Sequence, residues 1–180
     1  MSILVIAEHD NDSLKGATLN TVTAATSLSG DVAILVAGSN IDDVVSECQT
    51  LDNISKILKC DCETYANAIA EDLSSLVLAN CDGFTHLLAP STTFGKNLMP
   101  RISAKLDSQQ ISDIISVESD DTFKRPIYAG SCIATVKSND SVKVITVRST
   151  AFDSITKNNS GVDVQEINDD GSSNISTVVG

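Results

Sequence analysis

The stretch HLLAPSTTFGKNLMPRISAKL, residues 86–106, contains the unit from which the fold is predicted. An apolar run ends at Pro90, a polar turn follows, and a helical pattern of apolar residues begins near Phe94. A short, continuous apolar run is typical of a strand that is buried on both faces, as the strands of parallel sheets are. The stretch therefore predicts a strand, a turn and a helix that packs back onto the sheet.

The same unit recurs through the first two thirds of the chain. Strands are expected at 2–8, 31–38, 54–60 and 85–90, and helices at 14–28, 41–51, 64–80 and 94–106. Asp12 or Ser13 is placed to cap the first helix. Residues 111–149 instead show strand-like runs joined by polar turns, which indicates hairpins. We therefore predict an α/β domain whose largely parallel sheet carries an antiparallel hairpin extension.

Residues 1–150 are predicted to form this domain, and residues 151–180 to form a polar, acidic tail or linker. The tail is rich in Ser, Asn, Asp and Gly, a composition that favours a linker over a packed element. One short strand is expected at 162–167. A tail of this kind often precedes another domain, so we expect a further domain to follow it.

The totals exclude several classes of protein. The 180 residues suit one domain with a sizeable core, and the net charge of −12 argues against nucleic acid and against anionic membrane surfaces. No apolar run approaches the roughly 20 residues of a membrane span, and the run at 3–7 is too short for a signal peptide. Five scattered cysteines indicate reduced thiols. We expect a bacterial cytoplasm or a mitochondrial matrix, without direct membrane insertion.

The turn after Pro90 has the outline of a phosphate-binding loop. A P-loop needs Gly, four residues, then Gly-Lys and a Ser or Thr. Here Pro90 stands at the first glycine position, and Asn97 follows the lysine. Amides at a helix start can still hold an anion weakly, and the alternative is an ordinary helix start where a glycine allows close packing. The candidate residues for weak anion binding are Thr92, Thr93, Gly95 and Lys96.

Other patterns that could carry chemistry match no known site. The turn at 8–16 lacks the dinucleotide-binding glycines. A metal cluster there would be formed by Glu8, His9, Asp10 and Asp12, but its spacing fits neither zinc nor calcium patterns. Cys60 and Cys62 lack paired Cys-x-x-Cys ligands, and His86 is interpreted as a hydrogen-bonded core residue. No Ser or Cys has a nucleophile elbow around it. We therefore predict no catalytic residue and no metal site.

The segment TFKRPIYA, residues 122–129, is expected to lie on a hairpin that protrudes from the domain. An aromatic, an arginine and a proline on an exposed strand suit a partner interface. The candidate interface residues are Phe123, Arg125 and Tyr128. The alternative is an ordinary hairpin without a partner.

Three segments together carry a resemblance to a known family. They are LVIAEHDNDSLKGATLNTVTAA (4–25), FGKNLMPRISAKLDSQQISDIISVESDDTFKRPIYAG (94–130) and ATVKSNDSVKVITVRSTAFD (134–153). In this order, the chain from Ile3 to Asp153 resembles the N-terminal domain of electron-transfer flavoprotein alpha subunits. The resemblance implies a three-layer, Rossmann-like fold of the adenine-nucleotide-hydrolase type. It also implies a heterodimer with a beta subunit that carries AMP, the two subunits together holding one FAD.

The same resemblance implies a role in electron transport. Members of the family accept electrons from acyl-CoA-type and other flavin dehydrogenases of fatty-acid and amino-acid oxidation, and pass them to a quinone reductase or another acceptor. The FAD-binding domain is expected to follow the tail, so no cofactor is expected in this chain. The chain is then a non-catalytic scaffold that binds the beta subunit and supports the FAD domain. The alternatives are a free-standing adenine-nucleotide-binding module that uses the Thr92–Lys96 loop, and a dehydrogenase in its own right.

Overall fold

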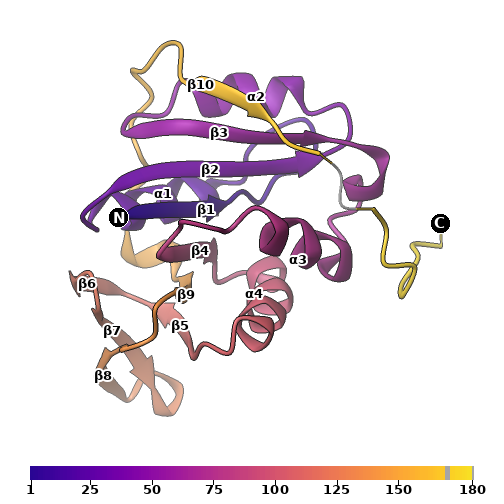
Figure 1. Cartoon of the computed structure of the whole chain (residues 1–180). Helices are drawn as coiled ribbons and strands as arrows, with labels where there is room; N and C mark the ends of the chain where they lie inside the picture. Colours follow the sequence, from indigo (N-terminus) through magenta and orange to yellow (C-terminus); the bar gives the residue numbers. More distant parts are fainter. Residues whose placement is uncertain (169–170, 180) are drawn as a thin grey trace.

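The computed structural model describes residues 1–168 and 171–179. Seven strands form one sheet in the order β10-β3-β2-β1-β4-β9-β5, and every neighbouring pair is parallel (Figure 1). These strands are β1 (Ser2–Ile6), β2 (Asp31–Gly38), β3 (Ile54–Asp61), β4 (His86–Pro90), β5 (Gln110–Ile114), β9 (Lys143–Val147) and β10 (Asp163–Glu166). The helices are α1 (Gly16–Thr26), α2 (Asp42–Gln49), α3 (Ala70–Ala79) and α4 (Thr93–Lys105), with 3-10 turns η1 (Glu63–Tyr65), η2 (Tyr128–Gly130) and η3 (Ser149–Ala151).

The central strand β1 shows why the molecule has three layers. Its side chains alternate between the two faces of the sheet, and all of those from Ile3 to Ile6 are fully buried. Ile3 and Val5 pack in the core beneath α1 and α2, whereas Leu4 and Ile6 pack beneath α3 and α4. Both faces are therefore covered by helices, as a parallel sheet requires. The predicted α/β, Rossmann-like class is confirmed.

Two helix predictions differ from the structure near a turn. The residue before α1 is Lys15, which makes no side-chain cap, so the predicted cap by Asp12 or Ser13 is wrong. The Asp10 carboxylate instead accepts hydrogen bonds from the amides of Asp12 (3.2 Å) and Ser13 (2.8 Å). Asp12 and Ser13 therefore belong to a hydrogen-bonded turn that precedes the helix. The helix expected at 64–80 begins later, as α3, because Ala68 has a left-handed φ of 48° that interrupts it.

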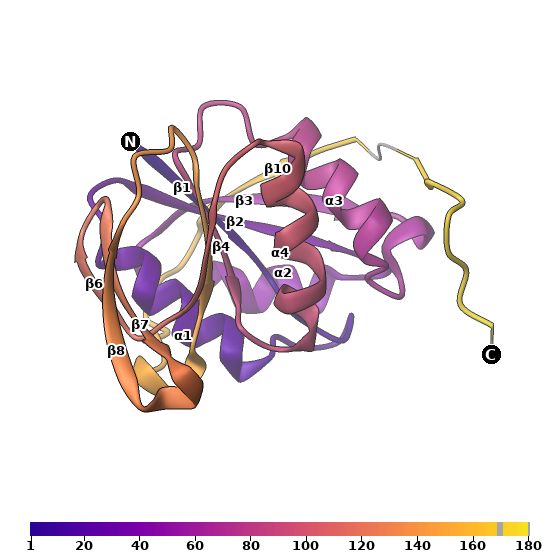
Figure 2. The same ribbon diagram turned by 90° about the horizontal axis from the view of Figure 1, so that it is seen from below.

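The segment expected to form hairpins is divided between two sheets. Its first and last runs become β5 and β9 of the parallel sheet, so the expectation of hairpins throughout 111–149 is wrong there. The runs between them form a separate antiparallel sheet, which confirms the predicted extension. Its strands are β6 (Ser116–Ser119), β7 (Thr122–Ile127) and β8 (Cys132–Lys137), here called the arm. Figure 2 shows the arm on one side of the molecule and residues 171–179 on the other.

The arm has an inner and an outer face, as the two-residue period of its strands requires. Phe123 pairs with Val136 and Val117 on the inner face and is fully buried in the same core as α1 and α2. Arg125 donates from Nε to the backbone oxygen of Ser112, within β5, at 2.7 Å. The root of the arm is therefore fixed to the body by an aromatic anchor and by a guanidinium.

After β9 the chain returns across the body instead of leaving it. Phe152 and Ile155 pack against the core beneath α1 and α2, and β10 then pairs with β3 in parallel. The short strand expected within 162–167 is confirmed as β10, while a domain boundary at residue 150 stays a prediction. Within residues 1–168 and 171–179, no helix has both the length and the apolarity to cross a bilayer.

Candidate functional site

The strand order points to one place for a ligand. In an open parallel sheet, ligands bind beyond the carboxyl ends of the strands, where the strand order reverses. Here the reversal lies between β1 and β4, since the chain continues from β1 to β2 on one side and resumes at β4 on the other. We call this place the crevice. It is formed by the loops that follow β1, β2 and β4.

The start of α4 lies very close to the end of β4. A Cβ atom added at Gly95 would be 2.0 Å from the backbone oxygen of Pro90, so only glycine fits there. Gly95 thus serves close packing of the helix onto the strand. Thr93 and Lys96 are exposed, and the Lys96 amide donates to the oxygen of Thr92 at 2.9 Å as part of the helix.

The chain places its own carboxylate beside this helix start. The Thr92 hydroxyl, at the cap position of α4, donates to Oε2 of Glu8 at 2.7 Å. The Glu8 amide in turn donates to the hydroxyl oxygen of Thr18 at 2.9 Å, which fixes the turn after β1. A negative charge is favourable at a helix N-terminus. An incoming phosphate would therefore meet the negative charge of a carboxylate beside this helix start.

The floor of the crevice above β2 is also covered. A Cβ atom at Gly38 would lie 2.3 Å from Oδ1 of Asn11 and 2.8 Å from Cε1 of His9. Asn11 accepts from the Ser39 amide at 3.2 Å and donates from Nδ2 to the Ala66 oxygen at 2.9 Å. The asparagine side chain therefore packs closely against Gly38, which no larger residue could replace.

The imidazole of His9 completes this cover. Its Nε2 lies 3.1 Å from the Ala37 oxygen, which can only accept, and its Nδ1 lies 3.1 Å from the Asn11 amide, which can only donate. These partners fit the neutral ring with the proton on Nε2. Burial lowers the pKa of His9, which agrees with the neutral form.

A second helix start at this edge is occupied in the same way. The amides of Asn40 and Ile41, just before α2, donate to the two oxygens of Asp61 at 2.8 and 3.3 Å. Glu8, Asn11 and Asp61 thus satisfy the groups that a nucleotide would use. Sequence reasoning did not single out Asn11 or Asp61. The signal available for Asn11 was an asparagine in a tight acidic turn, where its φ is 73°.

The other side-chain clusters considered in the sequence are not assembled as sites among the described residues. Within residues 1–168 and 171–179, no three His, Cys, Asp or Glu side chains converge as metal ligands. Asp10 pairs with Lys15 in the turn, which keeps the pKa of this carboxyl far below its usual range. None of the five cysteines, all of which the structure describes, forms a disulfide, and burial raises the pKa of Cys48 to about 12. A thiol with that pKa is a poor nucleophile at neutral pH.

His86 lies at the opposite, amino end of the sheet and joins the arm to the body. Its fully buried ring is 2.7 Å, at Nε2, from the backbone oxygen of Asp120 in the β6–β7 turn, and 2.9 Å, at Nδ1, from the Thr85 hydroxyl. The Asp120 carboxylate accepts from the Ser29 amide at 2.7 Å. Burial lowers the pKa of His86. The interpretation of His86 as a hydrogen-bonded core residue agrees with this geometry.

The three interface candidates are separated by the structure. Phe123 is buried, and Arg125 is half-buried with its side chain bound to Ser112, so both hold the arm in place. Tyr128 lies at the arm tip and is 78% exposed, and Ile133 beside it is 59% exposed. Tyr128 has a left-handed φ of 49°, which is rare for an aromatic residue. Of the three candidates, Tyr128 is the exposed one, and a role of all three at an interface stays a prediction.

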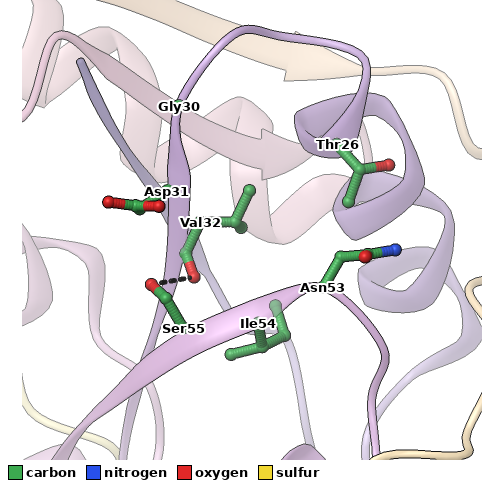
Figure 3. Close-up of a pocket in the computed structure, with 7 residues that line it drawn as sticks. All are labelled: Thr26, Gly30, Asp31, Val32, Asn53, Ile54 and Ser55. Atoms are coloured by element: carbon green, nitrogen blue, oxygen red, sulfur yellow. Dashed lines mark hydrogen bonds between the residues drawn. The ribbon is translucent and has the colours of Figure 1, made fainter.

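An open hollow of about 510 Å³ lies at the amino edge of the sheet, away from the crevice, and Figure 3 shows the residues around it. It is lined by Thr26, Gly30, Asp31, Val32, Asn53, Ile54 and Ser55. The pairing of β2 with β3 shifts register here, and the Ser55 hydroxyl donates to the Val32 oxygen at 2.9 Å. The hollow is therefore explained by a bulge in the sheet.

Comparisons with known proteins agree with the family suggested by the three segments. The family model described as electron transfer flavoprotein domain matches residues 3–178. The chain is 46% identical over 180 residues to the electron transfer flavoprotein subunit alpha of Pseudomonas aeruginosa, covering all of this chain and 58% of that protein. It is 41% identical over 174 residues to the mitochondrial subunit alpha of Dictyostelium discoideum, covering 92% of this chain and 49% of that protein.

A third relative, the probable mitochondrial subunit alpha of Cryptococcus neoformans, is 42% identical over 174 residues, with 93% and 50% of the two chains covered. The resemblance stated from the sequence is confirmed. The chain spans about half the length of the curated relatives it matches.

The contact at the start of α4 predicts a large difference between two glycines. Gly95→Ala is expected to destabilise the protein by about 3 kcal/mol, because the added methyl group meets a backbone oxygen that cannot move aside. Gly16→Ala, in the first turn of α1, meets no atom within 4 Å and is expected to be neutral or stabilising by about 0.4–1 kcal/mol. Urea denaturation of both variants checks this, and equal midpoints would contradict it.

The buried histidines predict a pH dependence of stability. Because burial lowers the pKa of His86 and His9, the unfolded chain takes up protons that the folded chain does not. The stability that the buried, neutral rings contribute is therefore complete above a pH of about 6.5. As the pH drops through that value, the free energy of unfolding falls by up to about 1.4 kcal/mol per pH unit for His86.

Denaturation between about pH 5.5 and 7.5, set around the ordinary histidine pKa, measures this slope. His86→Gln keeps a donor for the Asp120 oxygen and should show a shallower slope than the wild type. A slope that stays the same in His86→Gln and in His9→Gln would show that these rings do not titrate as described.

Proposed function

Because this chain belongs to the electron transfer flavoprotein family, we propose that it forms the N-terminal scaffold of an alpha subunit. In this proposal it binds a beta subunit and supports an FAD-binding part of a longer protein. The named alpha subunits to which it is similar are about twice its length, which leaves room for such a part in those proteins.

The observation that carries the proposal is the occupation of the crevice. At the place where this fold usually holds a ligand, Glu8, Asn11 and Asp61 already bind the amides and hydroxyls that face inward. A domain whose own side chains bind the polar groups of its crevice is suited to support a cofactor that is held elsewhere. In flavoproteins the cofactor supplies the redox chemistry, and the protein positions it.

The electron path is proposed from the family alone. FAD in the full-length protein would accept electrons from acyl-CoA-type flavin dehydrogenases of fatty-acid and amino-acid oxidation. It would pass them to a quinone reductase or another acceptor. The chain is then a non-catalytic part of an electron carrier, in a bacterial cytoplasm or a mitochondrial matrix. Relatives from both a bacterium and mitochondria support these two locations.

We assign the contact with the beta subunit to the tip of the arm. Tyr128 and Ile133 expose apolar surface there, while Phe123 and Arg125 fix the root of the arm. A rigidly held, exposed aromatic residue is the kind of side chain that dominates binding energy at protein interfaces. The left-handed backbone at Tyr128 and Ala129 adds local strain, which is commonly found at functional positions.

The arm predicts opposite effects for its two aromatic residues. Tyr128→Ala should weaken binding of the beta subunit at least about tenfold and change stability by less than about 0.5 kcal/mol. Phe123→Ala should cost about 3–5 kcal/mol of stability, since it leaves a cavity in the core. Ile175→Ala, at an exposed apolar position outside the arm, is the control.

The measurement uses the full-length alpha subunit that contains this chain and its beta subunit, with binding followed by titration and stability by denaturation. Unchanged affinity in Tyr128→Ala, with the flavin-containing heterodimer still formed, would remove the arm tip from the interface. Failure of the wild-type pair to associate at all would contradict the proposed function itself.

A further inference from the structure

Residues 151–167, here called the strap, cover one edge of the sheet by a long return path. The strap leaves β9 through η3 and passes α1, where the Asn20 side chain donates to the Phe152 oxygen at 2.7 Å. It ends as β10 beside β3 (Figure 1). The composition of this segment favours a linker, yet its contacts join it to the body at several points.

The first fastening is a clasp at the turn between α2 and β3. The Asp52 amide donates to the Thr156 oxygen at 2.9 Å, and the Asn159 amide donates to the Thr50 oxygen at 3.0 Å. The Asp52 carboxylate accepts from the amide of Asn158 at 3.2 Å, from its Nδ2 at 3.0 Å, and from the Thr156 hydroxyl. These donors, first the Thr156 hydroxyl and then the Asn158 side chain, lower the pKa of Asp52.

An ion pair lies next to the clasp. The Lys157 ammonium is 2.6 Å from Oε1 of Glu47 on α2. The other oxygen of Glu47 accepts from the Leu14 amide at 2.9 Å, so this carboxylate connects the strap to the turn after β1. Lys157 is also a cleavage position for trypsin, and in the fastened strap its side chain is engaged.

The second fastening is β10 itself. The Gln49 side chain donates to the oxygen of Val162, which is buried, at 3.1 Å. The Ile167 amide donates to the Lys59 oxygen at 2.8 Å, and the Lys59 ammonium is 3.2 Å from Glu166. The edge of β3 is therefore closed by a short strand that carries two carboxylates, Asp163 and Glu166. Short, charged edge strands resist further pairing.

The charges of the two strands match in register. Asp163 lies opposite Lys56, and Glu166 lies opposite Lys59. If the strap opens, the backbone groups along the outer edge of β3 lose their partners in β10. This edge carries two lysines, and Ile57, which is buried in the closed form, also lies on β3. The segment that fits this edge in register and in charge is the same strap from a second copy of the chain. Exchange of an identical element between copies is a common route to dimers.

From this geometry we propose that the strap is an edge guard, a segment that covers the edge of β3 and prevents it from pairing with another chain. The strap is fastened at Asp52, and its opening lets β3 pair with the strap of a second copy. The proposal is independent of the proposed electron-transfer role. It assigns a specific use to a segment whose composition favours a linker.

Two variants loosen the clasp from opposite sides. Asp52→Ala removes the acceptor on the body, and Asn158→Ala removes a donor on the strap without altering the body. Asp153→Ala, an exposed carboxylate at the start of the strap, is the matched control. Trypsin cleavage after Lys157, identified by mass spectrometry, reports how often the strap opens, since proteolysis follows the open population when opening is fast. Light scattering over a concentration series reports pairing between copies.

The expected result is several-fold faster cleavage after Lys157 in both clasp variants, with a dimer fraction that rises with concentration above that of the wild type. The control should match the wild type in both measurements. Wild-type cleavage rates in both variants would overturn the clasp. Faster cleavage without any gain of dimer would overturn the role as an edge guard. Circular dichroism of each variant shows that the body stays folded during the comparison.

Discussion

A parallel sheet collects helix starts and unpaired polar groups at its carboxyl edge, and these groups need partners. In most proteins of this shape a ligand supplies some of the partners. Here Glu8 meets the cap of α4, Asp61 meets the amides before α2, and Asn11 covers Gly38. These polar groups of the crevice therefore have partners within the chain itself. The loop at 92–96, which resembles a phosphate site in outline, starts a helix that packs closely against β4.

The same principle extends to the two sides of the sheet. The arm lies against β5 and is held by Phe123, by Arg125 and by His86 at its turn. The strap closes β3 through β10. Each edge is thus covered by a segment of the chain, and exposed apolar surface in the arm is concentrated at its tip, at Tyr128 and Ile133. This distribution is consistent with a scaffold that offers one protruding contact to a partner.

The periodic parts of the fold could be predicted from sequence, because burial of both sheet faces leaves continuous apolar runs such as β1 and β4. The pairing of β5 and β9 could not, since a run of apolar residues does not show which strand it will join. The hydrogen bonds within the crevice could not be predicted for a related reason. Glu8 and Thr92 are 84 positions apart in the sequence, and only the fold brings them together. Phe123 was taken for a surface residue because the local pattern shows that a strand has two faces but not which face meets the body.

Calorimetric titration with AMP and ATP tests the central claim, that the chain fills its own crevice, most directly. The wild-type protein should show no binding at nucleotide concentrations up to about the millimolar range, where even weak complexes of about −4 kcal/mol become visible. Lys96→Ala should leave this result unchanged, since Lys96 points to solvent at a helix start already occupied by Glu8. Micromolar binding that Lys96→Ala abolishes would contradict the account and identify a working nucleotide site.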